Sequence, residues 1–113
     1  MKHLHLVFLA LFLCACGSNA RKITAEMAYQ GVSNYCHGEY DWSVAEDNPA
    51  LMGIEMGEET DSTYQVVFRS YTGAQVHFHV DKKSGTTRMV EHVPALNIES
   101  EAGTIDLFDY LKK

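Results

Sequence analysis

Two groups of side chains in the body of this chain could carry chemistry: a cysteine beside a histidine, and a set of histidines farther along. Cys36-His37 places a thiol next to an imidazole, the two groups that thiol proteases use as nucleophile and base. Neighbouring helix residues point about 100° apart, however, and a catalytic cysteine and histidine normally come from distant parts of a chain. We therefore predict no catalytic residue and a buried, unreactive Cys36, with an intermolecular disulfide as the alternative.

His77 and His79 are separated by one residue, which on a strand directs both imidazoles to one face and allows them to hold one metal ion. His92, on the next expected strand, could be a third ligand. Arg69 and Arg88 fall on the same face, however, and their positive charges repel a divalent cation. We therefore predict that these five residues contact a partner, with an acidic or carboxylate-bearing group favoured. A metal site formed by the three histidines is the alternative.

An acidic segment covers residues 39–61, where eight Asp and Glu residues occur without a Lys or Arg. It lacks the D-x-[DN]-x-[DN]-G spacing of a calcium loop, so we predict a solvated loop. Trp42 lies within this loop and could anchor a partner or cover the end of a helix. The sequence has no G-x-S-x-G motif and no Gly-rich phosphate loop, and we predict no cofactor.

The first element that must position these side chains is a helix. Thr24 is its expected N-cap and Gly38 its expected end, with Gly31 inside it at a cost of about 1 kcal/mol relative to Ala. One apolar stripe should face a core. Its members are Ala25, Ala28, Val32, Tyr35 and Cys36.

Strands and a short helix should follow. The strands are expected at residues 51–56, 63–70, 74–81 and 86–93. A three-residue turn at residues 71–73 places Tyr64, Val66, Phe68, Val76, Phe78 and Val80 on one face, to which Met89 is added. A loop after Pro94 should lead to Thr104, the expected cap of a helix docked by Ile105, Phe108 and Leu111. The fold class is α+β: an N-terminal helix on a three- to four-stranded antiparallel sheet, with a short C-terminal helix.

The N-terminal segment has the order of a bacterial lipoprotein signal. Lys2 precedes an unbroken apolar run at residues 6–13, and small residues stand next to Cys16. In such signals the thiol receives a diacylglyceryl group and the chain is cut before the cysteine. We predict lipidation at Cys16, a signal peptide over residues 1–15 and a lipidated tether over residues 16–22.

Two other interpretations of this segment compete. Cleavage after Ala20 would release a soluble protein that begins at Arg21. A retained transmembrane helix is disfavoured, because a bilayer needs roughly 20 apolar residues and this run is much shorter. Gly17, after the lipidated cysteine, resembles the pattern of Gram-negative lipoproteins that reach the outer membrane. The predicted location is therefore the cell envelope, with the lipid inserted in the outer membrane.

Length and charge restrict the remaining possibilities. Residues 23–113 suffice for one domain. The net charge of −6 argues against nucleic acid as a partner, because affinity for nucleic acid comes from Lys and Arg that neutralise phosphates. With Cys16 lipidated and Cys14 removed, Cys36 has no intramolecular partner, and the fold must depend on its apolar core.

The stretch Tyr64-Gln65-Val66-Val67-Phe68-Arg69, followed by residues 76–85, resembles the strands and the V-D-x-x-[ST]-G turn of PepSY domains. The resemblance covers residues 23–93. It implies an extracytoplasmic, non-enzymatic domain with a helix packed on an antiparallel sheet, in a family suspected of inhibiting or chaperoning peptidases. A weaker similarity in element order is to the propeptide-like inhibitors of streptopain-type proteases. The expected function is a membrane-anchored module that binds a protein or peptide, in one form a peptidase inhibitor; the alternative is a periplasmic metal-binding protein.

Overall fold

Helix α2 (Ala25–Glu39) begins where the sequence predicts. In this computed structural model, which describes residues 22–112, Thr24 is the N-cap, and its Oγ1 accepts a hydrogen bond from the backbone N–H of Met27 at 3.1 Å. Ala28, Val32 and Cys36 are buried as expected. Ala25 is exposed, so its place in the predicted stripe is wrong: it lies in the first turn beside Met56, over a hollow rather than over the sheet.

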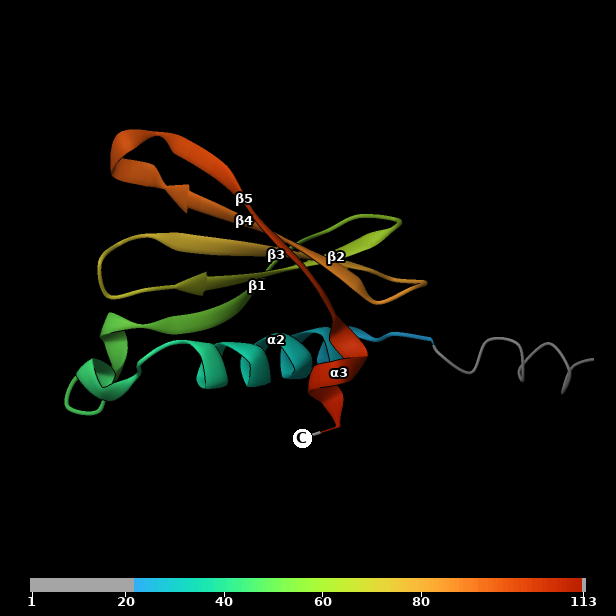
Figure 1. Ribbon diagram of the computed structural model, residues 1–113, viewed down its shortest axis with the longest axis horizontal. Helices are drawn as coiled ribbons and strands as arrows, with labels where there is room; N and C mark the ends of the chain where they lie inside the picture. Colours follow the sequence, from blue (N-terminus) through green and yellow to red (C-terminus); the bar gives the residue numbers. More distant parts are fainter. Residues whose placement is uncertain (1–21, 113) are drawn as a thin grey trace, which may run out of the picture.

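Five strands follow the helix and pair antiparallel in chain order, as a meander (Figure 1). They are β1 (Gly53–Glu59), β2 (Thr63–Arg69), β3 (Gln75–Asp81), β4 (Thr86–Val93) and β5 (Ile98–Asp106). The predicted register is confirmed, because Tyr64 pairs with Val80, Val66 with Phe78 and Phe68 with Val76. Short 3₁₀ helices lie at η1 (Ser43–Ala45), η2 (Pro49–Leu51) and η3 (Pro94–Leu96).

The sheet has five strands rather than three to four, since the segment predicted as a loop after Pro94 contains β5. All residues of β5 except Ile105 are exposed, so the strand has no buried face and its sequence shows no apolar alternation. Helix α3 (Leu107–Leu111) then begins later than expected. Its N-cap is Asp106 rather than Thr104: the Asp106 carboxylate accepts a hydrogen bond from the Phe108 N–H at 3.0 Å.

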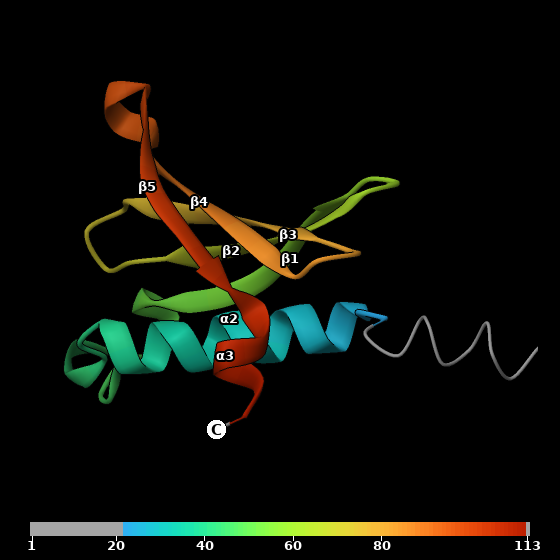
Figure 2. The ribbon, with the colours of Figure 1, turned by 45° about the vertical axis from the view of Figure 1, so that its right-hand side comes forward.

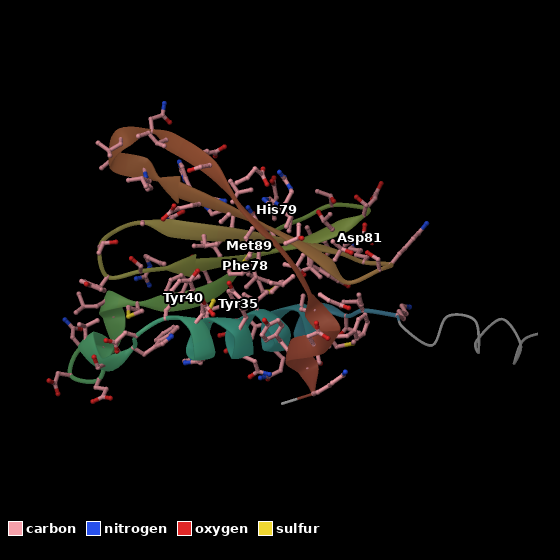
Figure 3. All side chains as sticks on the ribbon, in the orientation of Figure 1. Tyr35, Tyr40, Phe78, His79, Asp81 and Met89 are labelled. Atoms are coloured by element: carbon pink, nitrogen blue, oxygen red, sulfur yellow. The ribbon has the colours of Figure 1, made fainter. Side chains whose placement is uncertain are left out.

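Both helices cover the same face of the sheet (Figures 1 and 2), and the core lies between them and β1 to β4. Figure 3 shows Tyr35, Tyr40 and Phe78 in this layer, whereas His79 projects from the opposite side. We call the side with the helices the inner face and the other side the outer face. Among residues 22–112, no element covers the outer face.

The meander gives the domain two ends. We call the end where α2 starts the proximal end; it also contains the turns after β1 and β3, and α3 (Figure 1). The distal end contains the C-terminus of α2, η1, η2 and the turns after β2 and β4. In both ribbon views the β4–β5 hairpin rises away from α2 at the distal end. Within residues 22–112, no helix is long and apolar enough to cross a membrane.

Candidate functional site

The predicted lipidation site cannot be placed in the fold. Cys16, the signal peptide over residues 1–15 and the tether up to residue 21 lie outside the described residues. Lipidation of Cys16 therefore stays a prediction. The described chain enters the fold at Lys22, at the proximal end.

Cys36 is fully buried in α2, as predicted. Burial raises the pKa of its thiol to about 12, and only the thiolate is a strong nucleophile, so this cysteine is not activated for catalysis. His37 does not contact the thiol in a catalytic pair. Its ring stacks on Trp42 with centroids 4.2 Å apart.

His77 is held by two glutamines on the outer face. The amide Nε2 of Gln65 donates to Nδ1 of His77 at 3.1 Å, and Nε2 of His77 donates to Oε1 of Gln75 at 2.9 Å. Oε1 of Gln65 in turn accepts a hydrogen bond from the backbone N–H of Glu58 at 2.9 Å. Both ring nitrogens of His77 thus form hydrogen bonds within the sheet. The same network ties β2 to the part of β1 between Met56 and Glu59, where the strand register shifts. This arrangement gives His77 a structural role.

The three candidate metal ligands are not gathered around one point. His92 lies edge-on to His77 with ring centroids 5.4 Å apart. His79 lies opposite Arg88 of the neighbouring strand β4. Nδ1 of His92 is buried and finds no hydrogen-bond partner within residues 22–112. In that part of the chain no group of three or more His, Cys, Asp or Glu residues is placed to hold a metal ion, so the geometry gives no support to the alternative of a three-histidine site.

The two arginines predicted to contact a partner are already engaged. Nη1 of Arg69 donates to the carbonyl of Ala50 at 3.1 Å, and Arg88 forms an ion pair with Glu101 at 2.7 Å. The register places Glu55 and Glu99 on the same outer face, beside these cations. Charge on this face therefore gives no preference for an acidic partner.

Trp42 covers the C-terminus of α2, one of the two roles expected for it. Its indole Nε1 donates to the carbonyl of Cys36 at 3.0 Å, and its ring is tilted against Phe68 with centroids 5.6 Å apart. Tyr40 stacks on the same Phe68 at 4.5 Å. Burial is the main cause that raises the pKa of Tyr40 to about 12, with smaller contributions from Cys36, Tyr35, Glu39 and Glu91. These aromatic rings close the core only partly at this end.

A hollow of about 420 Å³ lies beside this aromatic group, between the end of α2 and the β4–β5 hairpin. We call it the distal hollow. Its lining residues are Tyr40, Asp41, Met52, Phe68, Ser70, Tyr71, Thr72, Ala74, Val76, Glu91 and Ala102. Sequence reasoning missed this site, although one signal was present: with Met89 on the inner face, the strand period places Glu91 there too.

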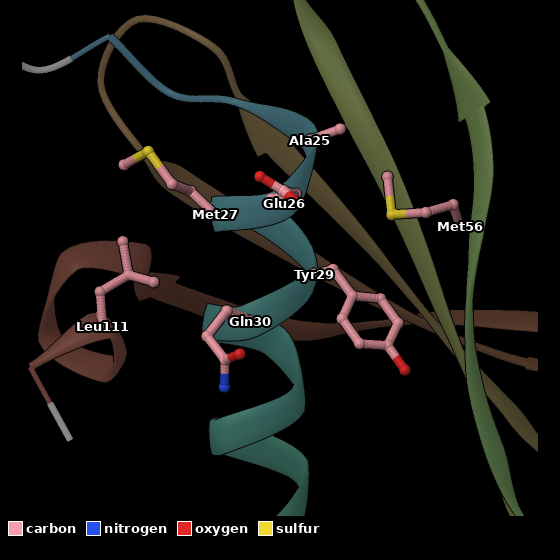
Figure 4. Close-up of a pocket in the computed structure, with 7 residues that line it drawn as sticks. All are labelled: Ala25, Glu26, Met27, Tyr29, Gln30, Met56 and Leu111. Carbon is pink, nitrogen blue, oxygen red and sulfur yellow. The ribbon is translucent and has the colours of Figure 1, made fainter.

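A second, shallower hollow of about 620 Å³ follows the exposed side of α2 near its start (Figure 4). Met27 and Leu111 lie on one side of the helix there, and Tyr29 and Met56 on the other. Glu26 is its only ionisable carboxylate. Side chains from both sides of the helix line this open hollow.

No protein-family model, no curated protein and no solved structure matches this chain. The resemblance to PepSY domains therefore stays a prediction.

Proposed function

We propose that this chain is a membrane-anchored, extracytoplasmic module that binds a protein or peptide at its distal end. One observation carries the proposal: exposed large apolar side chains collect there. Of the seven such residues in the part of the chain that the structure describes, five lie at the distal end. They are Val44, Leu51, Tyr71, Leu96 and Ile98.

Single exposed apolar residues are normal on protein surfaces, but a group of them rimmed by polar residues marks an interaction site. Leu96 is 66% exposed, Tyr71 57% and Ile98 49%, and they belong to two different hairpin turns and the start of β5. Leu51 of η2, next in the chain to Met52 of the distal hollow, is also exposed. Exposure on several neighbouring elements supports a surface that a partner covers.

The predicted anchor agrees with this orientation. A lipid on Cys16 would attach the chain at the proximal end, because the described residues start there and lead directly into α2. The distal end then points away from the lipid surface toward other envelope proteins. A peptidase is the partner class that the PepSY resemblance implies.

Site-specific photo-crosslinking in the living cell tests the binding surface. Benzoylphenylalanine placed at Tyr71 or Leu96 should give discrete adducts, whereas the same residue at Asp61 or Lys83 in the proximal turns should not. Adducts that form equally from both ends, or only from the proximal turns, would contradict the proposal.

Membrane attachment needs its own test. The variant Cys16→Ser should move the chain from the membrane fraction to the soluble fraction, because a lipid is the expected attachment. If the parent chain is already soluble and begins at Arg21, cleavage after Ala20 is correct and the anchor is wrong.

A further inference from the structure

The distal hollow combines an apolar floor with a polar rim. Met52, Phe68 and Val76 are buried beneath it, and Tyr40 stands at its side, stacked on Phe68. Its volume of about 420 Å³ lies at the small end of the range of about 300–1,000 Å³ for ligand pockets. Space of this size accommodates one or two large side chains of a partner.

The charge in the hollow has one sign. Of its lining residues, which all lie within residues 22–112, none is Lys, Arg or His, while Asp41 and Glu91 are acidic. Hydrogen bonds from Ser43 lower the pKa of Asp41, so its carboxylate is ionised at neutral pH. Glu91 stands next to Val76 on the inner face, beyond the end of α2.

The surroundings reinforce this charge. Every lysine within residues 22–112 lies at the proximal end; they are Lys22, Lys82, Lys83 and Lys112. Arg69 is directed to the outer side, against Ala50 and Gly53. The C-terminus of α2 also points its partial negative charge toward the distal end. Within residues 22–112, no lysine or arginine side chain therefore lines the hollow to compete with a bound cation.

We propose that the distal hollow binds a lysine or arginine side chain presented by the partner protein, and this proposal rests on the proposed function above. The aliphatic part of such a side chain packs on Met52, Phe68 and Val76. Its charged end lies between Asp41 and Glu91, beside the exposed ring of Tyr71, whose face attracts cations.

Trp42 provides a direct readout, because it is the only tryptophan of the chain and contacts Phe68 at the floor of the hollow. The full chain in a nonionic detergent is titrated with a lysine-rich peptide blocked at both ends. The matched probe is the same peptide with glutamine in place of each lysine. We expect saturable change of Trp42 emission, with affinity about tenfold lower for the glutamine peptide.

The double variant Asp41→Asn/Glu91→Gln should lower the affinity for the lysine peptide by about tenfold or more. Asparagine retains the acceptor for Ser43, so the local turn is kept. The matched control is Glu55→Gln/Glu99→Gln, which removes the same charge from the exposed outer face and should bind as the parent does. Equal weakening in both double variants, equal binding of both peptides, or no binding by the parent would each overturn the inference.

Crosslinking separates this inference from the function on which it rests. If adducts at Tyr71 and Leu96 form in the parent and persist undiminished in Asp41→Asn/Glu91→Gln, the distal end binds a partner but the acidic hollow does not select it. If the parent gives no distal adducts, the proposed function itself fails. Loss of the adducts in the double variant and not in its control supports both.

Discussion

The proximal and distal ends of the sheet are closed in different ways. At the proximal end, α3 folds back on α2, and Leu107 is fully buried against Gly31. The backbone N–H of Leu107 donates to the carbonyl of Gly85 at 2.9 Å, and Nδ2 of Asn34 donates to the carbonyl of Tyr110 at 2.6 Å. Side chains and backbone groups together thus seal this end.

The distal end has no second α-helix in the described chain, and aromatic residues take its place. Tyr40 and Trp42 pack on Phe68, but the space beside them stays open and carboxylates line it. The chain is therefore packed more tightly at the end predicted to face the lipid. The other end keeps exposed apolar surface, which binding to a partner would bury.

The variant Leu107→Ala should cause the largest loss of stability. Deleting a fully buried leucine removes transfer free energy and leaves a cavity, at a typical cost of about 2–5 kcal/mol. Urea denaturation followed by Trp42 fluorescence measures the free energy of unfolding. Leu96→Ala at the distal turn is the matched control, expected within about 0.5 kcal/mol of the parent. Similar losses in both variants would remove the distinction between the two ends.

Replacement of Gly31 by alanine should be the next largest effect. A Cβ atom there would overlap the side chain of Leu107, which the close approach of α3 holds in place. Overpacking of this kind costs about 1–3 kcal/mol. Gly38→Ala is the control in the same helix, because its Cβ would meet nothing within 4 Å. This variant should raise the free energy of unfolding by about 0.5–1 kcal/mol. A stabilised Gly31→Ala variant would show that α3 does not pack closely on α2.

These glycines show where sequence reasoning stops. The cap at Thr24, the buried stripe of α2 and the register of β2 with β3 follow from local patterns, because capping and strand alternation are short-range properties. Gly31 has no such pattern. From the sequence alone, Gly31 only lowers the stability of the helix. Its role depends on Leu107, far along the chain, which packs in the space that a Cβ atom would occupy.

The same limit applies to β5 and to the distal hollow. A strand exposed on both faces has no hydrophobic period, so β5 looks like a loop. The hollow joins residues that directly follow α2, residues of two hairpins and Met52 just before β1, which no spacing in the sequence connects. Strand alternation predicts the correct face for the three histidines, but the two glutamine partners of His77 depend on side-chain geometry.

Trp42→Phe tests how much the aromatic closure of the distal end contributes. The change removes the indole hydrogen bond to the Cys36 carbonyl, for which a net loss of about 1 kcal/mol is expected. Far-ultraviolet circular dichroism must follow the unfolding, since the fluorescent residue is gone. Tyr71→Phe, at an exposed ring, should stay within about 0.5 kcal/mol of the parent. A loss as large as that of Leu107→Ala would mean that the distal end is sealed as firmly as the proximal one.

The smallest effect should come from pH, through histidines that belong to neither end. Burial, then the neighbouring charge of His92, lowers the pKa of His77; burial, then Arg88, lowers the pKa of His79. Below the ordinary histidine pKa of about 6.5, the unfolded chain therefore binds more protons than the folded chain. The free energy of unfolding should fall as the pH drops through that pKa. The variant His77→Gln/His79→Gln should flatten this pH dependence between about pH 7.5 and 5.5, one unit on either side of the ordinary histidine pKa.

Gly31→Ala is the control for this measurement. Because the two histidines are on the outer face, far from Gly31, the slope of the free energy of unfolding against pH in Gly31→Ala should equal that of the parent. A slope that changes with Gly31→Ala would mean that the outer face and the proximal end unfold as one coupled unit.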